Sequence, residues 1–302
     1  RKLPNVSLGA FLIQMVTRKK KENVKSYLHI RRYMYHRYGI GNVFENMARG
    51  IIARGGEVIY NAVIKEIGIN REQGINKIVL DGPHGAQVKG DLFVSTIPLD
   101  SLVGYFSPVI TDFENISREL PFRNGIIVNV VIDRNKFDDP HWTYLVNKRF
   151  YFNRVSETKN FSLHCAPEGK TLLMLEKICA PQDPVWEWDV EKWRPKVEAD
   201  LGILGIKPTE IKEIFTSKMD KAFPFYRVGY ESAKKSFLDR IVSLKNLVTT
   251  GRYGLFLDIN MHDAMVLGIE GFKYLNEGRL KEFYQTHEEI PILFRQQKAE
   301  AK

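Results

Sequence analysis

The chain has 302 residues, of which 44% are hydrophobic, 12% aromatic and 27% charged, so disordered, collagen-like and coiled-coil proteins are excluded and two compact units are favoured over one. Its 45 Lys and Arg residues outnumber 36 Asp and Glu, which favours anionic partners such as phosphates, nucleotides or acidic membrane surfaces without choosing among them. The two cysteines, Cys165 and Cys179, lack zinc-ligand spacing, so no metal site is expected.

Residues 1–38 are predicted to be mostly helical and basic, as part of a substrate or cap region. The dense cluster Arg18–Lys21 is interpreted as a solvated helix face, with peripheral contact to an acidic membrane surface as the alternative. The apolar run Leu8–Val16 is too short to span a membrane, and no signal-peptide pattern is present. We therefore expect a cytoplasmic protein, or one peripheral to the inner face of a membrane, whose true N-terminus lies upstream of Arg1.

Residues 39–100 show helical and strand patterns in alternation. A glycine turn at 39–42 precedes a helix over Asn42–Arg54, which Gly55 and Gly56 end. The segments predicted to be extended are Glu57–Tyr60, Ala62–Ile69, Lys77–Leu80 and Asp91–Thr96. The last of these is apolar in its middle, like a strand that is covered on both faces.

Residues 101–221 change to a strand-rich character and are predicted to form an inserted substrate domain. The predicted elements are strands at Ile126–Ile132, Thr143–Phe152, Phe161–Cys165 and Thr171–Ile178 and a helix at Asp189–Leu201. From 222 to 280 the α/β pattern returns, with a strand over Asn246–Thr250 and a helix over Asn260–Leu275, before a tail at 281–302. One α/β domain is thus predicted to be interrupted by another domain.

The strongest chemical signal is the segment in which the strand Asn246–Thr250 ends in a glycine turn at Gly251 and Gly254 and a helix then starts at Asn260. A helix start has free backbone N–H groups and a partial positive charge, so it can hold an anionic or electron-rich group. On spacing alone, an ordinary strand, turn and helix without a ligand is an equal alternative.

This segment resembles the closing flavin motif of the FAD-dependent amine-oxidoreductase or protoporphyrinogen-oxidase-like flavoproteins, to which UDP-galactopyranose mutase is related. The resemblance implies that the glycine turn lies near the FAD pyrophosphate and ribityl chain, and that the backbone at Met261 faces the flavin ring. The cofactor-binding residues that it implies are Val63, Thr96, Gly251, Arg252, Gly254, Asn260 and Met261.

Three earlier segments resemble the same family in the same order. They are the glycine turn at 38–42 with its helix, the unit Gly55–Val63, and the strand Asp91–Pro98. In relatives, the backbone at the position of Val63 meets the adenine, and the third segment ends over the cofactor at Thr96. The implied fold is an incomplete FAD-binding, Rossmann-like α/β domain with a parallel sheet, covering 39–100 and 222–280, interrupted by an α+β substrate domain with a mostly antiparallel sheet.

The sequence departs from the family where the dinucleotide is bound. Family members open with a strand and a GxGxxG loop, which these 302 residues lack. Gly39 and Gly41 do not replace it, because Phe44 stands where the third glycine is needed. We therefore expect a C-terminal fragment of an FAD-dependent oxidoreductase, inactive and binding FAD poorly by itself. Apolar surface should be exposed on its incomplete sheet at Phe93, Val94, Leu247 and Val248.

No nucleophile and base constellation is recognisable, so cofactor-borne chemistry is favoured and the catalytic residues are unassigned. His262 and Asp263 are interpreted as supporting or capping residues of the helix start. The expected substrate is a small molecule, and no nucleic-acid partner is expected; the oligomeric state stays open.

Two other functions are kept. One is a mutase like UDP-galactopyranose mutase that uses reduced FAD on a nucleotide sugar, since arginines suit diphosphate. The arginines available for this are Arg123, Arg149, Arg154, Arg227 and Arg252. The other is a non-catalytic, flavin-free binding module.

Overall fold

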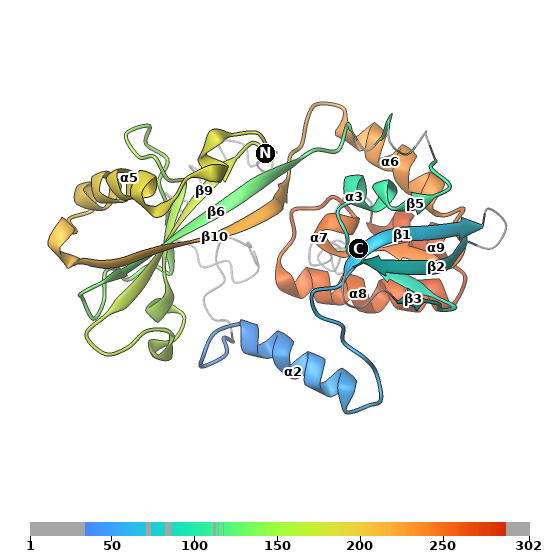
Figure 1. The fold of residues 1–302 in the computed structure, drawn as a ribbon, viewed down its shortest axis with the longest axis horizontal. Coiled ribbons are helices and arrows are strands. Elements are labelled where there is room, and N and C mark those ends of the chain that lie inside the picture. Colours follow the sequence, from blue (N-terminus) through green and yellow to red (C-terminus); the bar gives the residue numbers. More distant parts are fainter. Residues whose placement is uncertain are drawn as a thin grey trace, which may run out of the picture.

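The computed structural model describes residues 34–70, 74–81, 86–110, 113, 115–116 and 118–287. These residues form two lobes side by side, and extended chain segments run between them (Figure 1). One lobe holds a five-stranded sheet, and the other holds a four-stranded sheet and a two-stranded sheet. The basic cluster and the apolar run predicted within 1–38 lie outside the described residues.

The lobe with two sheets, the α/β lobe, has the strand order β3-β2-β1-β5 in one sheet and the parallel pair β11–β4 in the other. Its strands are β1 (Val63–Asn70), β2 (Gly74–Asp81), β3 (Gln87–Val88), β4 (Phe93–Ser95), β5 (Phe106–Ser107) and β11 (Leu247–Thr249). Its helices are α3 (Leu99–Gly104), α6 (Tyr230–Ile241), α7 (Gly251–Gly254), α8 (Met261–Asn276) and α9 (Leu280–His287).

The other lobe, the antiparallel lobe, has the strand order β10-β6-β9-β8-β7. Its strands are β6 (Phe122–Ile132), β7 (Trp142–Tyr144), β8 (Arg154–Glu157), β9 (Thr171–Cys179) and β10 (Ile211–Pro224). Its helices are α5 (Val190–Ile203) and the short 3-10 turns η3 (Thr158–Asn160), η4 (Leu163–Cys165), η5 (Pro184–Glu187) and η6 (Pro208–Glu210). The helix α2 (Gly41–Ile52) lies below both lobes in Figure 1 and has no buried residue.

The core of the antiparallel lobe is built on one face of β6. Every second residue from Ile126 to Ile132 is fully buried, because successive side chains of a strand point to opposite faces. These side chains pack in one cluster with Trp193 and Val197 of α5. Asp189 caps that helix by accepting a hydrogen bond from Lys192 N at 3.0 Å.

The two sheets of the α/β lobe are joined by the side chain of Asn246. Its amide accepts a hydrogen bond from Ile75 N and donates one to Ile75 O, each at 2.8 Å. Gly74 lies against the same amide with φ +94°, and a Cβ there would meet Asn246 Oδ1 at 2.1 Å. The start of β11 is therefore fixed to β2 by a contact that requires glycine at 74.

The α/β class with a parallel pair and a separate antiparallel sheet is confirmed, whereas several local predictions are wrong. Phe161–Cys165 is not a strand but a turn that ends in η4, where Ser162 Oγ accepts a hydrogen bond from His164 N. Glu57–Tyr60 forms no strand, and of Thr143–Phe152 only the first two residues are extended. The elements β10, α6 and α9 were not predicted.

Candidate functional site

Two parallel strands end at the same edge of the α/β lobe. Thr249 of β11 lies beside Ser95 of β4, and Thr250 N donates a hydrogen bond to Ser95 O at 2.9 Å. Thr96 follows directly after β4 and is exposed. In α/β proteins, ligands bind outside the carboxyl ends of parallel strands. This edge is the candidate site.

The glycine turn packs against the end of β4. Gly251 has φ +77°, a conformation that favours glycine, and the nearest atom to a Cβ there would be Thr96 Cγ2 at 3.8 Å. At Gly254 a Cβ would meet Ser95 O at 3.0 Å and the carbonyl carbon of Thr249 at 3.3 Å. The structure thus brings together three of the predicted residues, Thr96, Gly251 and Gly254, and explains both glycines.

Arg252 braces the loop between α7 and α8. Its guanidinium donates a hydrogen bond to Ile259 O and lies 3.6 Å from the Asp258 carboxylate. It also lies over the ring of Phe223, 5.5 Å from the centroid. The side chain therefore fixes the residues just before Asn260, a structural role that the sequence did not predict.

The start of α8 completes the edge. Asn260 N donates a hydrogen bond to Asp263 Oδ2 at 3.2 Å, so the Asp263 carboxylate caps the helix as predicted. Asp263 is buried, and its Oδ1 has no hydrogen-bond partner among the described residues. Asn260 and Met261 are exposed at the first turn. Val63, the remaining predicted residue, is exposed at the start of β1 and belongs to the other sheet of the lobe.

Two aromatic residues that the sequence analysis missed hold the loop in place. Phe256 has φ +48° and is fully buried, with its ring 5.1 Å from that of Phe122 and 5.6 Å from that of Tyr226. Asp258 N donates a hydrogen bond to the Tyr226 hydroxyl at 2.6 Å. Desolvation of that hydroxyl raises the pKa of Tyr226. Neither residue stands in a sequence motif, so the sequence did not predict that Phe256 and Tyr226 support the loop.

A bulge in β10 connects the two lobes beside this edge. The register of β10 against β6 shifts between Met219 and Phe223, and Lys221 adopts φ +53° within the shift. Its ammonium donates hydrogen bonds to Asp100 Oδ2 at 2.8 Å and to Ser101 Oγ at 2.5 Å, both in α3. Bulges of this kind re-aim side chains near active sites.

The arginines considered for diphosphate binding do not gather at one place. Arg154 forms an ion pair with Glu176, and Arg149 lies over the ring of Phe150, both within the antiparallel lobe. Arg123 lies over Phe225, 4.0 Å from the ring centroid, where the lobes meet. Only Arg123 and Arg252 therefore stack on aromatic residues at the lobe junction, through Phe225 and Phe223.

The sequence model of the flavin containing amine oxidoreductase family matches residues 2–233. The chain belongs to this family. The matched residues stop before β11, so the strand, turn and helix at 247–276 are supported here by their own geometry. Comparison with curated proteins gives no match.

Solved structures share the fold of the chain. A reduced UDP-galactopyranose mutase is similar with a TM-score of 0.65 and 14% identity over 79% of this chain and 52% of that one. A protein assigned as a protoporphyrinogen oxidase from an Exiguobacterium species gives 0.59 and 19% over 79% and 51%, and a putrescine oxidase variant gives 0.56 and 14% over 79% and 53%. The chain spans about half the length of these structures.

A flavin, the cofactor of the family, fits this edge in part. The backbone at Gly251 carries no side chain, and the N–H groups at the exposed start of α8 suit an electron-rich ring edge. No GxGxxG loop for a pyrophosphate occurs in the 302 residues. Within the described ranges, no helix has the length and apolar character to cross a membrane, and no three His, Cys, Asp or Glu side chains group as metal ligands.

Proposed function

We propose that this chain forms the flavin-facing and substrate-binding part of an FAD-dependent oxidoreductase that acts on a small molecule. The observation that carries this proposal is the shared edge of β4 and β11, where Thr96, Gly251 and Gly254 lie together ahead of the start of α8. FAD, when bound, supplies hydride or electron transfer. The protein residues would bind and orient it at this edge, and the substrate would lie toward the antiparallel lobe.

The pyrophosphate of FAD would be bound by a segment outside these 302 residues. In support, β4 pairs only with β11 among the described residues, and Val94 at its centre is 46% exposed. Ile269 and Phe272 on α8 are also exposed. Apolar faces of this kind are usually covered by neighbouring elements. Of the four residues predicted to be uncovered, however, Leu247 and Val248 are buried, so the prediction is wrong for β11.

A second candidate is a mutase that uses reduced FAD on a nucleotide sugar. It is favoured by the similarity to the reduced UDP-galactopyranose mutase and by the two arginines at the lobe junction, Arg123 and Arg252. Arginine pairs well with diphosphate because its planar fork of donors binds two oxygens at once. The structural bracing of Ile259 by Arg252 leaves Arg123 as the better diphosphate ligand of the two.

The test of the cofactor compares the 302-residue chain with a version whose reading frame is extended upstream through a strand, GxGxxG turn and helix. We expect flavin absorbance at full occupancy only in the extended version, because the loop supplies N–H groups to the pyrophosphate. Full occupancy in the shorter chain contradicts the proposed division of the site. Failure of both to bind FAD supports the flavin-free binding module.

The test of the reaction is an anaerobic titration of the extended version. Bleaching of the flavin by an amine or a porphyrinogen-like reductant, without dithionite or NAD(P)H, is the result expected for an oxidoreductase. Turnover of a UDP-sugar only after prior reduction, with no change of redox state, favours the mutase. Arg252→Ala should weaken FAD binding by about 10-fold or more through loss of the brace, whereas Arg194→Ala, on α5 of the antiparallel lobe, should leave it unchanged.

A further inference from the structure

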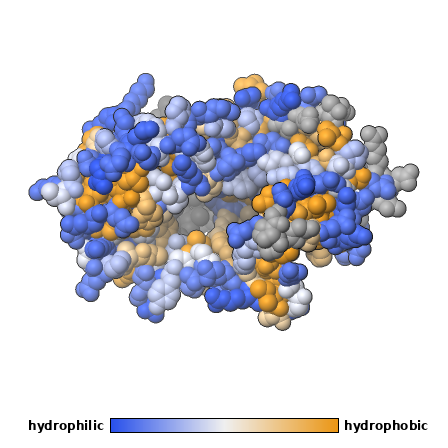
Figure 2. Space-filling model, in the orientation of Figure 1, coloured by the Kyte–Doolittle hydropathy of each residue, from blue (hydrophilic) through white to orange (hydrophobic). Residues whose placement is uncertain are grey.

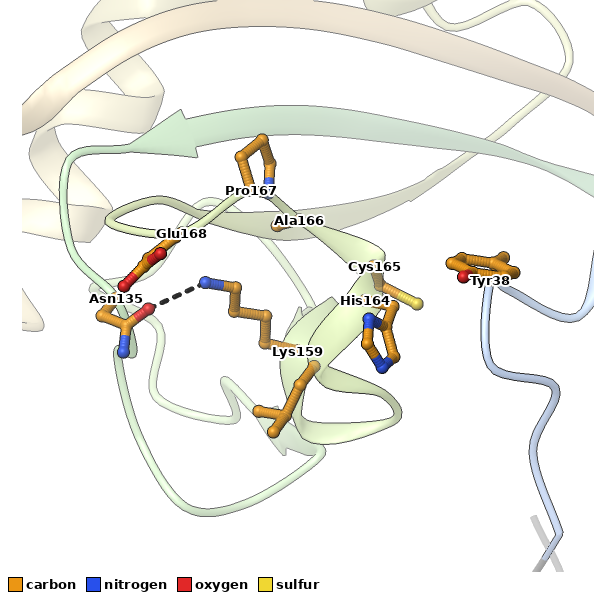
Figure 3. Close-up of a pocket in the computed structure, with 9 residues that line it drawn as sticks. Tyr38, Asn135, Lys159, His164, Cys165, Ala166, Pro167 and Glu168 are labelled. Atoms are coloured by element: carbon orange, nitrogen blue, oxygen red, sulfur yellow. Dashed lines mark hydrogen bonds between the residues drawn. The ribbon is translucent and has the colours of Figure 1, made fainter.

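A cavity of about 620 Å³ opens beside η3 and η4 in the antiparallel lobe. It is lined by Tyr38, Asn135, Lys159, Leu163, His164, Cys165, Ala166, Pro167 and Glu168 (Figure 3). We call it the distal cavity. Asn135 comes just after Ile132, the last residue of β6, whereas Phe122, the first residue of β6, adjoins the other lobe. The 11 residues of β6 at about 3.4 Å each separate these ends by roughly 35 Å, so the distal cavity is not part of the candidate flavin site.

Lys159 is the unusual group of this cavity. Its side chain is buried, with 7% relative exposure, although lysine is almost never fully buried without a partner. Its only hydrogen bond with the described residues goes to a neutral acceptor, Asn135 Oδ1, at 2.9 Å. None of the ion pairs among these residues involves it. Burying an ammonium without an ion pair is costly, so an anion that entered the cavity could pair with this charge.

The other lining residues set the chemistry around this charge. Leu163, Pro167 and the thiol of Cys165 provide apolar surface, and burial raises the pKa of Cys165, which keeps the thiol uncharged. The His164 ring lies against Tyr38, with centroids 5.6 Å apart, on the side of the cavity opposite to Asn135 in Figure 3. Among the lining residues, the exposed Glu168 carboxylate is the one negatively charged group, and it is not within 4 Å of the Lys159 ammonium.

We propose that the distal cavity is a second binding site, which holds a small oxyanion, a carboxylate or a phosphate group, on the ammonium of Lys159. Asn135 orients the ammonium, and the apolar surface near Cys165 receives the body of the ligand. Glu168 lowers the affinity by like-charge repulsion. This proposal is independent of the flavin chemistry, because no residue of the cavity belongs to the β4–β11 edge.

The two cysteines of the chain provide the readout. Cys165 lines the distal cavity, whereas Cys179 is buried in β9. Alkylation by iodoacetamide, followed by mass spectrometry of each cysteine, is measured with inorganic phosphate or butanoate against sodium chloride of equal ionic strength. We expect one of the two anions to slow alkylation of Cys165 several-fold and to leave Cys179 unchanged; which anion protects identifies the oxyanion. No protection by either anion overturns the proposal.

Two variants make the test specific. Lys159→Met should abolish the protection, and Lys170→Met, outside the cavity lining, should keep it; equal protection in both variants overturns the role of Lys159. Because Lys159→Met removes a buried side chain, its thermal melting is compared with that of the parent. Should it fail to fold, Glu168→Gln decides, because loss of the opposing charge should strengthen protection, and unchanged or weaker protection contradicts the proposal.

Discussion

The exposure of a valine at the centre of a strand differs between the two lobes. Val128 of β6 is fully buried, whereas Val94 of β4 is 46% exposed. β6 has β9 and β10 on its two sides and α5 in the same core cluster, but β4 pairs only with β11 in the described part of the chain. Burial is thus set by the neighbours that the topology supplies. On the face drawn in Figure 2, orange hydrophobic patches lie on both lobes, so the hydropathy of this face does not distinguish them.

The largest expected effect tests whether the antiparallel lobe closes its own core. Trp193→Ala removes a fully buried ring from α5 and should lower the free energy of unfolding by about 3–5 kcal/mol. Urea unfolding followed by circular dichroism measures the loss. The matched control, Trp142→Ala, truncates an exposed indole of β7 and should cost much less. Similar losses in the two variants would break the comparison.

The next effect concerns the tight packing at the site edge of the α/β lobe. Gly254→Ala places a Cβ at 3.0 Å from Ser95 O, a backbone atom that cannot move aside freely, and should destabilise the chain by about 1–3 kcal/mol. Gly268→Ala, within α8 and with nothing within 4 Å of its Cβ, should stabilise by about 0.5–1 kcal/mol. Thermal melting of both variants gives the opposite signs that we expect; equal signs would contradict the packing.

Tyr284 of the α/β lobe should contribute an alkaline pH dependence of stability. Burial raises the pKa of Tyr284 from 10.0 to about 12, and its hydroxyl accepts a hydrogen bond from Thr249 N. Because the folded state holds this proton more tightly, the stabilisation is complete below pH 10 and is lost as the pH rises to about 12. Urea midpoints across this window should fall more steeply for the parent than for Tyr284→Phe. Parallel curves would remove Tyr284 as the cause.

The smallest effect on folding tests the uncovered face of α8. Ile269→Gln changes a side chain that is 72% exposed, so stability should shift by no more than about 0.5 kcal/mol. Aggregation should nevertheless decrease, because the apolar patch with Phe272 becomes smaller. Light scattering measures this, with the exposed polar Lys273→Gln as the control on the same helix. A large loss of stability would show that Ile269 is covered in solution.

The sequence was sufficient for elements with a regular apolar period. The strands around Ile126 and Thr171 and the helices α5 and α8 were predicted within a few residues, because their buried positions recur at the spacing of one face. β10 was missed because its residues 215–221 are mostly polar and exposed, and its extended form depends on pairing with β6. The apolar composition of Phe161–Cys165 predicted a strand, but the Ser162 side chain caps the backbone locally and a 3-10 turn forms instead.

The sequence predicted the strand, turn and helix of the candidate site, but not the side-chain contacts that hold them in place. Spacing predicted only a strand, a glycine turn and a helix, and it was the resemblance to the family that implied a shared cofactor edge for Thr96, Gly251 and Gly254. The brace from Arg252 to Ile259 and the wedge formed by Phe256 join residues whose proximity depends on the path of the loop. Periodicity carries no information on such contacts, so the flavin contacts of Val63 and Met261 stay predictions.

Pro121 O accepts a hydrogen bond from Phe225 N at 2.8 Å, so the chain leaves the α/β lobe and returns to it at neighbouring points. Because the two chain segments that connect the antiparallel lobe to the α/β lobe are hydrogen-bonded neighbours, a short turn could join them in place of the inserted lobe. Replacing residues 124–222 by such a turn would remove the antiparallel sheet and keep Phe122, which packs on Phe256, and Phe223, over which Arg252 lies. For the same reason, another domain could be inserted at this position without a large change in the path of the α/β lobe.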